Sequence, residues 1–285
     1  MMFPEISEIE YALYVNYFYK LVGITLPDHK RSGFGRKLAA RMEALGIPSY
    51  ASFFRYIRTP QGAGELATIV NHVTIDQSRF FRGEGQLAHF ADVIVPGLAL
   101  RQRSTRKLRI WSAGCSRGQE PYTVAMILAE KAREVFTWDF KILATDVDSD
   151  SLKTASLGIY GAETAGEVAP ELLSKYFSTP RGKPPPPYRV KAILRNRVSF
   201  RKLNLMNSPY PIRGPFQVIL CRNVMIYFDA ATRKNIVSEF HRLLADDGYL
   251  FLGGTESLFG VDDRFTLVGQ AVYRKNCNGP ANIRP

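Results

Sequence analysis

The chain has 285 residues, 46% of them hydrophobic, with a formal net charge of +12 at pH 7, and this is enough apolar material for a large core and more than one domain. The N-terminus lacks the features of a signal peptide, and no apolar run approaches the ~20 residues that span a bilayer, so we expect a cytoplasmic protein without membrane insertion. Three scattered cysteines and four histidines form no ligand-spaced pair, which predicts that no metal is bound.

Residues 5–72 have the pattern of short helices punctuated by Pro27, Pro48 and Pro60. One apolar stripe is formed by Ile6, Ile9, Leu13, Tyr17 and Leu21. Basic residues gather in this segment, with Arg36, Lys37 and Arg41 among them. A second basic cluster comprises Arg101, Arg103, Arg106, Lys107 and Arg109. This charge implies an acidic partner, nucleic acid included, although each cluster also has the plain interpretation of a solvated face.

The most informative stretch runs from Leu108 to Tyr122. An apolar strand, 108–113, ends in a turn that contains Gly114 and Gly118, and a helix with Pro121 in its first turn follows. This order places a small molecule against bare backbone at the carboxyl edge of a parallel sheet. No Lys-Ser/Thr pair follows Gly118, and the full G-x-G-x-x-G pattern is absent, which argues against nucleoside triphosphates and dinucleotides.

A second strand, 140–145, ends at Asp146, a carboxylate suited to the hydroxyls of a ribose. Glu120 adds another negative charge, which disfavours a pyrophosphate but suits a cationic ligand. S-adenosylmethionine fits this pattern because it has a ribose, a sulfonium cation and no phosphate. The alternative for Asp146 is that it caps the next helix.

Further apolar runs at 198–203, 216–221 and 248–253 alternate with helical ones, which predicts a doubly wound α/β domain. The segments 264–268 and 271–275 indicate an antiparallel hairpin at the end of that sheet, a feature of class I (Rossmann-like) methyltransferases by fold analogy. Residues 157–197 interrupt the alternation, and their length predicts a small inserted β-subdomain. In it we expect a helix over 170–177 and strands over 188–190 and 192–194.

The predicted organisation is therefore an all-helical, basic N-terminal domain with its linker over 1–88 and a methyltransferase domain over 89–275. The tail, 276–285, has no apolar periodicity, and we expect it to be disordered.

The chain resembles the CheR family of chemotaxis receptor glutamate methyltransferases from its N-terminal helices to about Lys275. The order and spacing of several motifs carry this resemblance. They are Ser78-Arg79-Phe80-Phe81-Arg82, Trp111 to Tyr122, Ala144-Thr145-Asp146, Asn204-Leu205, the run from Cys221 to Asp229, and Gly248-Tyr249-Leu250.

The resemblance implies a role for each matched residue. The cofactor S-adenosylmethionine, and its product S-adenosylhomocysteine, would contact Ser78 and Arg82 from the linker, together with Gly114. Glu120 and Asp146 would bind the methionine amino group and the ribose hydroxyls, and Asn204 and Leu205 would lie by the adenine. Arg222 and Asn223 would line the pocket, unless they only form a turn at the strand end. Arg82 would also face the reacting centre with Tyr227, whose alternative role is core packing.

The family's substrate is the acidic helical cytoplasmic domain of chemoreceptors, methylated at glutamates. We expect a monomer that docks this helix on Arg36, Lys37 and Arg41. Two alternatives stay open: a module that binds S-adenosylmethionine or S-adenosylhomocysteine without catalysis, and a nucleic-acid methyltransferase. The second would carry an (Asn/Asp)-Pro-Pro-(Tyr/Phe) motif or a Pro-Cys pair where this chain has Cys221-Arg222-Asn223, so we expect no nucleic-acid partner.

The chain departs from the family pattern at three places. Asp76, within the expected cofactor site, replaces the usual Asn, and its extra charge would either attract the sulfonium or repel the methionine carboxylate. In the glycine turn, Arg117 and Gln119 replace the more usual Thr and Glu, and Arg117 would pair with Glu120 or with the cofactor carboxylate. In some members the β-subdomain grips a receptor's C-terminal pentapeptide. Here the proline-rich loop over 182–187 lacks the short glycine turn associated with that grip, which argues against such tethering.

Overall fold

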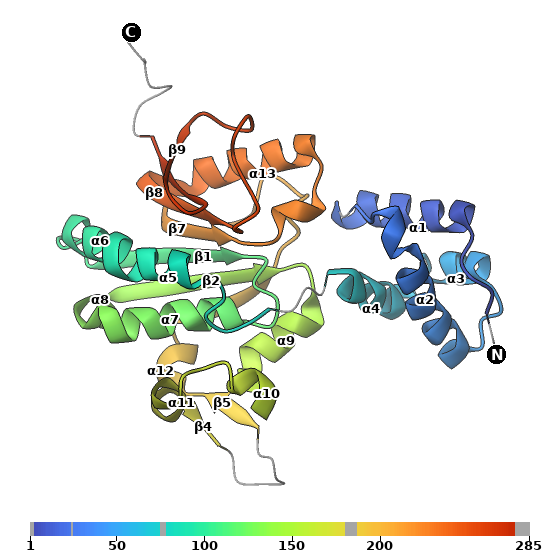
Figure 1. The fold of residues 1–285 in the computed structure, drawn as a ribbon, viewed down its shortest axis with the longest axis horizontal. Helices are drawn as coiled ribbons and strands as arrows, with labels where there is room; N and C mark the ends of the chain where they lie inside the picture. The colour runs from blue at the N-terminus through green and yellow to red at the C-terminus, as the bar shows by residue number, and fades with distance from the viewer. Residues whose placement is uncertain (1–2, 24, 75–77, 180–186, 277–285) are drawn as a thin grey trace. The chain divides into compact units, whose positions relative to one another are not determined.

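The computed structural model describes residues 3–23, 25–74, 78–179 and 187–276 (Figure 1). The chain divides into two compact units. The first comprises Met1–Asp76 together with Tyr227–Thr232, and the second comprises Gln77–Ile226 and Arg233–Pro285. Asp76 itself lies outside the described residues, as does most of the tail, so the expectations for both stay predictions.

The first unit is helical. Its elements are α1 (Glu8–Val22), η1 (Asp28–Lys30), α2 (Arg31–Leu45), α3 (Tyr50–Tyr56) and α4 (Ala63–Thr74). Ser7 and Glu10 form a capping box at the start of α1, and Gly23 ends the helix in a left-handed conformation. The three prolines fall between the helices, as predicted. The segment 227–232 joins this unit through the Tyr19 hydroxyl, which donates to the Asp229 carboxylate.

Of the apolar stripe predicted at the start of the chain, Ile6 is buried and Tyr17 and Leu21 are half-buried, but Ile9 and Leu13 were predicted wrongly. Ile9 is 78% exposed and Leu13 49% exposed, whereas the buried face carries Tyr11, Tyr14, Phe18 and Val22. Aromatic rings bury more apolar area than aliphatic side chains, and the tyrosine hydroxyls find acceptors when they are buried. The Tyr14 hydroxyl, for example, donates to the Tyr50 carbonyl at 2.8 Å.

The second unit is built on a seven-stranded sheet with the order β6-β2-β1-β7-β8-β10-β9. The parallel strands are β1 (Lys107–Ala113), β2 (Asp139–Asp146), β6 (Val198–Lys202), β7 (Phe216–Cys221) and β8 (Leu244–Leu252). The hairpin β9 (Phe265–Gly269) and β10 (Val272–Lys275) closes the sheet in antiparallel pairing. The doubly wound domain and its terminal hairpin are confirmed, with strand bounds close to the predicted ones.

Helices cover both faces of this sheet. Along β1, Ile110 belongs to the core cluster formed with α5 (Glu84–His89), η2 (Phe90–Ile94), α6 (Val95–Arg101) and α7 (Gln119–Lys131). The next side chain, Trp111, points to the opposite face and packs edge-on against Phe240 of α13 (Ala230–Leu243), with ring centroids 5.2 Å apart. This alternation is the two-residue period of a strand that is buried on both faces.

The remaining helices of the main sheet are α8 (Arg133–Thr137) and α9 (Ser149–Leu157), and the short turn η3 (Met225–Tyr227) follows β7. The inserted segment forms a separate three-stranded antiparallel sheet in the order β3-β5-β4. Its elements are β3 (Ile159–Tyr160), α10 (Ala162–Ala165), α11 (Pro170–Tyr176), β4 (Phe177–Ser178), β5 (Tyr188–Val190) and α12 (Ala192–Arg195).

Within the insert, the helix at 170–177 and the strand at 188–190 are confirmed, but the strand predicted over 192–194 is the helix α12. In this segment only Leu194 is buried, whereas Ile193 is 53% exposed. The three consecutive apolar residues 192–194 therefore did not indicate a buried strand. The proline-rich loop lies mostly outside the described residues, so the expectation on pentapeptide tethering stays untested.

Candidate active site

The carboxyl edge of the sheet carries the glycine turn between β1 and α7. Gly114 has φ +79°, and a Cβ there would lie 2.4 Å from the Val224 side chain. Gly118 has φ +90°, and a Cβ there would lie 2.8 Å from that of Ala155. Both positions therefore require glycine, because the backbone is left-handed and neighbouring side chains approach it closely. The turn presents bare backbone at the start of α7, as the sequence predicted.

Asp146 ends β2 directly beside this turn. One carboxylate oxygen accepts from the Ser116 amide at 2.7 Å and the other from the Asp148 amide at 2.9 Å. Burial raises the pKa of Asp146 in spite of these two bonds. The helix that follows, α9, is capped by Asp148, whose side chain accepts from the Asp150 amide. Asp146 is therefore not the cap of α9, and each of its oxygens retains a lone pair for a ligand.

Glu120, in the first turn of α7, is held on two sides. It accepts a hydrogen bond of 2.7 Å from the Ser112 hydroxyl and forms an ion pair of 3.4 Å with the Arg222 guanidinium. The two ionic side chains are only 15% and 8% exposed. Arg117 is exposed and forms no pair with Glu120, so that expected pairing was wrong, and the alternative pairing with a cofactor carboxylate stays a prediction.

Arg222 connects three elements around the site. Its Nε donates to the Gln86 side chain at 3.0 Å, one terminal nitrogen contacts Glu120, and the other donates to the Arg82 carbonyl at 2.5 Å. Gln86 in turn donates to the carbonyls of Leu252 and Gln270. Arg222 thus fixes the linker, α5 and α7 around the end of β7. Sequence reasoning missed Gln86, because one glutamine in a helical stretch carries no signal.

Asn223 forms the turn that follows β7, with φ +61°. This turn is held by Glu256, a residue that is 8% exposed and that sequence reasoning also missed. Its carboxylate accepts from the amides of Asn223 at 2.9 Å and Ile226 at 3.1 Å. The available signal was a carboxylate three residues after Gly253, at the end of a strand run. The turn at Asn223 is thus held by the Glu256 side chain, and the expectation that Asn223 lines the cofactor pocket stays a prediction.

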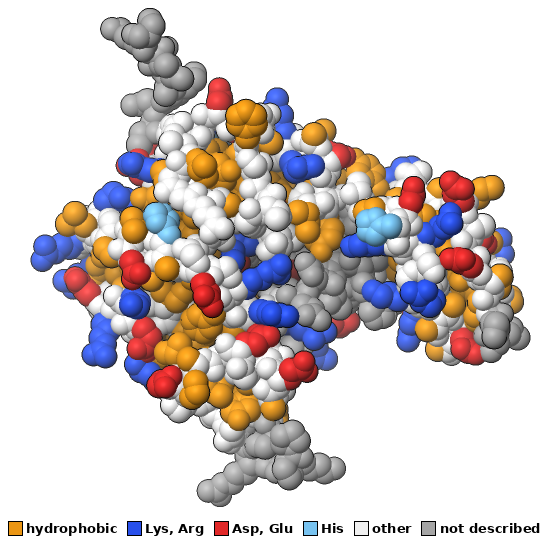
Figure 2. All heavy atoms as spheres, in the orientation of Figure 1, with side chains coloured by type: hydrophobic (Ala, Val, Ile, Leu, Met, Phe, Trp, Pro, Cys, Tyr) orange, Lys and Arg blue, Asp and Glu red, His pale blue; other side chains and the backbone are white. Residues whose placement is uncertain are grey.

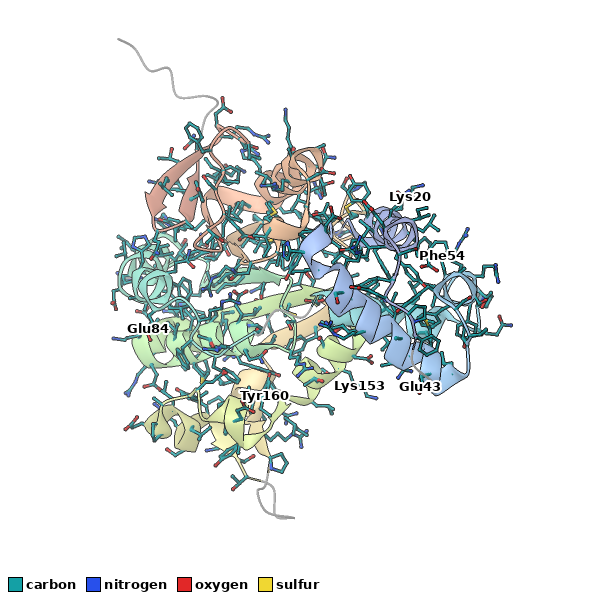
Figure 3. The ribbon with its side chains drawn as sticks, turned by 45° about the vertical axis from the view of Figure 1, so that its right-hand side comes forward. Lys20, Glu43, Phe54, Glu84, Lys153 and Tyr160 are labelled. Carbon is teal, nitrogen blue, oxygen red and sulfur yellow. The ribbon has the colours of Figure 1, made fainter. Side chains whose placement is uncertain are left out.

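The linker segment Ser78–Arg82 lies over the start of α7. The Ser78 carbonyl accepts from the Gln119 side chain at 3.2 Å, and the Phe81 amide donates to Thr123 at 3.1 Å. The Phe80 ring packs edge-on against Tyr160, labelled in Figure 3, with centroids 5.0 Å apart. These contacts bring Ser78 and Arg82 to the same edge as Glu120.

Asn204 and Leu205 follow β6, the neighbour of β2. The Leu203 amide donates to the Asp146 carbonyl at 2.9 Å, which brings this loop to the carboxyl edge. The Asn204 side chain accepts from the Met206 amide at 3.0 Å, and Leu205 is 8% exposed. Six predicted cofactor residues of the second unit, namely Gly114, Glu120, Asp146, Asn204, Arg222 and Asn223, thus border one edge of the sheet.

Tyr227 and the predicted docking residues belong to the first unit and are described within it. Tyr227 is half-buried, and its carbonyl accepts from the Thr25 amide at 3.0 Å, whereas Phe228 is buried in the core. On α2, Arg36 and Lys37 are exposed. Arg41 instead forms a two-pronged bond with Glu65 of α4, at 2.8 and 2.6 Å.

The site lacks an activated nucleophile among the described residues. Cys115 and Cys221 are buried, and burial raises the pKa of both thiols, so neither is a thiolate at neutral pH. The part of the chain that the structure describes also contains no group of three or more His, Cys, Asp and Glu residues that would hold a metal ion. No described helix is long and apolar enough to cross a membrane.

Comparison with known proteins matches two family models to this chain. The model of the CheR methyltransferase SAM-binding domain matches residues 76–274, and that of the CheR all-alpha domain matches residues 9–74. The chain belongs to the CheR methyltransferase family. Its relatives include a chemotaxis protein methyltransferase of Escherichia coli strain K12, which is 35% identical over 94% of this chain and 91% of its own length.

Two further CheR relatives are similarly close. A chemotaxis protein methyltransferase of Salmonella typhimurium is 35% identical, with 94% of this chain and 90% of that protein covered. Chemotaxis protein methyltransferase 1 of Pseudomonas aeruginosa is 34% identical, with 92% of this chain and 95% of that protein covered. The resemblance inferred from the motifs is therefore confirmed over almost the whole chain, the helical unit included.

Proposed function

We propose that this protein transfers the methyl group of S-adenosylmethionine to glutamate side chains on the helical cytoplasmic region of chemoreceptors. One observation carries the proposal. The glycine turn, Asp146 and Glu120 meet at the carboxyl edge of a class I methyltransferase sheet, in a chain whose CheR relatives are chemotaxis methyltransferases.

The residues at this edge fit the cofactor. Asp146 offers carboxylate lone pairs suited to ribose hydroxyls, and Glu120 offers a carboxylate suited to the methionine ammonium group. No lysine follows Gly118, so the turn lacks the side chain that a triphosphate needs. We assign Ser78 and Arg82 to the linker side of the cofactor and Asn204 with Leu205 to the adenine side. Arg222 and Asn223 complete the wall at the end of β7.

The acceptor chemistry suits a site without a general base. A glutamate side chain has a pKa near ~4.3, so at neutral pH it is already the nucleophilic carboxylate. S-adenosylmethionine supplies the activated methyl group. This chain has to hold the carboxylate oxygen in line with that methyl group and keep water out, and such positioning is worth on the order of 7–11 kcal/mol. Arg82 and Tyr227 are the residues that we assign to orient the carboxylate.

Docking of the acidic substrate helix is assigned to α2. Arg36 and Lys37 are exposed there and suit a negative surface. Arg41 forms an ion pair with Glu65. We therefore assign Arg41 a contribution to the positive potential of α2 rather than a direct contact with the substrate.

Cofactor binding is the first test. Isothermal titration with S-adenosylhomocysteine should show one saturable site, and Asp146→Asn should weaken it by about 10- to 100-fold, the effect of hydrogen bonds to a charged group. Asp263→Asn, on an exposed loop, is the matched control and should bind like wild type. Absence of binding by folded wild-type protein would overturn the proposal.

The second test identifies the kind of bond that the transferred methyl group forms. After incubation with a receptor cytoplasmic fragment and methyl-labelled S-adenosylmethionine, a glutamate methyl ester should release volatile label, as methanol, in alkali. Label that resists alkali would indicate methylation at another kind of atom. Cofactor binding without any label transfer would favour the non-catalytic module, and label on nucleic acid would favour a nucleic-acid methyltransferase.

A further inference from the structure

The second basic cluster lies at the end of the sheet opposite the cofactor site. Between Asp92 and Arg109 the sequence has five cations and a single carboxylate. The strand β1 starts within this cluster at Lys107 and ends at the glycine turn. Seven residues of strand separate the two ends by about 20 Å. A partner held at the amino end therefore leaves the carboxyl edge open.

Four of these cations have no carboxylate partner among the described residues, and one of the four, Arg101, contacts an aromatic ring instead. Arg109 pairs with Asp139 at 2.6 Å, and the Arg101 guanidinium lies over the Tyr249 ring at 5.7 Å. The single acid, Asp92, faces Lys131 at 3.9 Å. The exposed side chains of Arg103, Arg106 and Lys107 enter no ion pair within the described part of the chain.

Exposed apolar side chains adjoin these cations. The run from α5 through η2 to α6 buries Phe90, Ile94 and Leu98 on its inner side. On its outer side Leu100 is 74% exposed and Val93 57% exposed, with Pro96 exposed between them. Figure 2 shows Lys and Arg side chains at the left margin, where α6 lies in Figure 1, with hydrophobic side chains beside them. We name Val93, Pro96, Leu100, Arg103, Arg106 and Lys107 the amino-edge patch.

We propose that the amino-edge patch binds peripherally to the surface of an anionic phospholipid bilayer. Basic side chains are attracted to anionic headgroups, and aliphatic side chains on a convex helix surface enter the boundary between headgroups and acyl chains. A nucleic acid would engage the cations through its phosphates but leave Leu100 and Val93 without an apolar environment. The patch therefore matches a lipid surface better, and it would hold the protein with the cofactor edge directed away from the bilayer.

The test is co-sedimentation of the intact protein with vesicles of phosphatidylcholine alone or mixed with phosphatidylglycerol. The protein should bind only the anionic vesicles. Arg103→Gln with Arg106→Gln should weaken binding by about fivefold for each cation, or about 25-fold for the pair. Leu100→Ser should weaken it several-fold, and this loss should persist at high salt, because it does not depend on charge. The control, Lys20→Gln with Lys153→Gln, removes the same charge from exposed sites labelled in Figure 3.

S-adenosylhomocysteine titration of each variant separates this proposal from the proposed function, because all of them should bind the ligand like wild type. The proposal is overturned if wild type ignores anionic vesicles, or if the control loses as much binding as the Arg103/Arg106 variant. It is also overturned if the patch variants lose affinity for duplex DNA or for an acidic receptor fragment while vesicle binding is unchanged.

Discussion

At the scale of single residues, the site combines buried carboxylates with backbone amides that hold them. Desolvation raises the pKa of Asp146, while the amides of Ser116 and Asp148 favour its charged form. The charge of Glu120 is balanced by Arg222, which is itself nearly buried. Removing one member of such a pair leaves an uncompensated charge, and this is why we treat Arg222 as part of the site framework.

The raised pKa of Asp146 predicts a pH dependence of cofactor binding. Below its folded-state pKa this carboxyl is protonated and loses the charge that attracts ribose hydroxyls, so affinity should fall as the pH drops through this raised pKa. Titrating wild type with S-adenosylhomocysteine from neutral pH down to about pH 4, the ordinary aspartate pKa, measures this. The Asp146→Asn variant should show no such decline over the same window. A decline of equal size in both would assign the effect to another group.

Tyr227 carries a prediction on turnover. If its hydroxyl orients the accepting carboxylate, Tyr227→Phe should lower kcat by about tenfold, the value of one hydrogen bond to a charged group, and leave the Kd for S-adenosylmethionine nearly unchanged. Because only the hydroxyl is removed, the ring's packing is retained. Steady-state methylation of a receptor fragment, beside titration calorimetry, gives both numbers. Unchanged turnover would remove Tyr227 from the mechanism.

At the scale of elements, the sequence predicted the parts whose signal is local. The fold could be predicted from the strand-like runs before Gly114 and Asp146 and from the terminal hairpin. Each of these elements is determined by its own apolar pattern and turn residues. The buried face of α1 and the nature of residues 192–195 depend on which neighbours supply the core, which the pattern does not contain. Gln86 and Glu256 act through bonds to residues far away in the sequence, so no local pattern marks them.

Glu256 carries a prediction about the turn after β7. Glu256→Gln keeps one carbonyl acceptor for the several amides that the carboxylate now serves, so a buried donor is left unpaired at a cost of about 1–3 kcal/mol. Urea denaturation should show this loss, and the affinity for S-adenosylhomocysteine should fall with it because Asn223 moves. The exposed variant Glu84→Gln is the control for a mere change of charge. Wild-type stability in Glu256→Gln would contradict the assigned role.

At the scale of the whole molecule, the chain joins a helical unit to an α/β unit that carries the predicted cofactor residues. The proposed docking residues Arg36 and Lys37 belong to the helical unit, whereas the predicted cofactor residues from Ser78 to Asn223 belong to the α/β unit. Substitutions at the docking residues should therefore leave cofactor binding unchanged. The first unit has eight basic and eight acidic residues, so the net charge of +12 resides in the second unit, which carries the amino-edge patch. Arg36 and Lys37 are a local group of positive charge on α2.

The docking prediction follows from this separation. Arg36→Glu with Lys37→Glu should raise the KM for an intact receptor fragment at least tenfold, because like charges then face each other across the interface. The Kd for S-adenosylhomocysteine should not change. Raising the salt concentration should lower the affinity of wild type toward that of the variant. A parallel loss of receptor methylation and ligand binding would indicate misfolding instead.

The packing of Phe80 has a consequence for local unfolding. Its ring lies between Tyr160 and Phe177 of the small sheet, and its amide donates to Glu167 at 2.8 Å. Opening of the small sheet would therefore remove one support of the linker that carries Ser78 and Arg82, whose bonds to α7 and Arg222 would remain. In native-state hydrogen exchange, the Phe80 amide should exchange together with those of β3, β4 and β5 as one cooperative unit. The insert then contributes to the local stability of the linker over α7, a role that needs no ligand of its own.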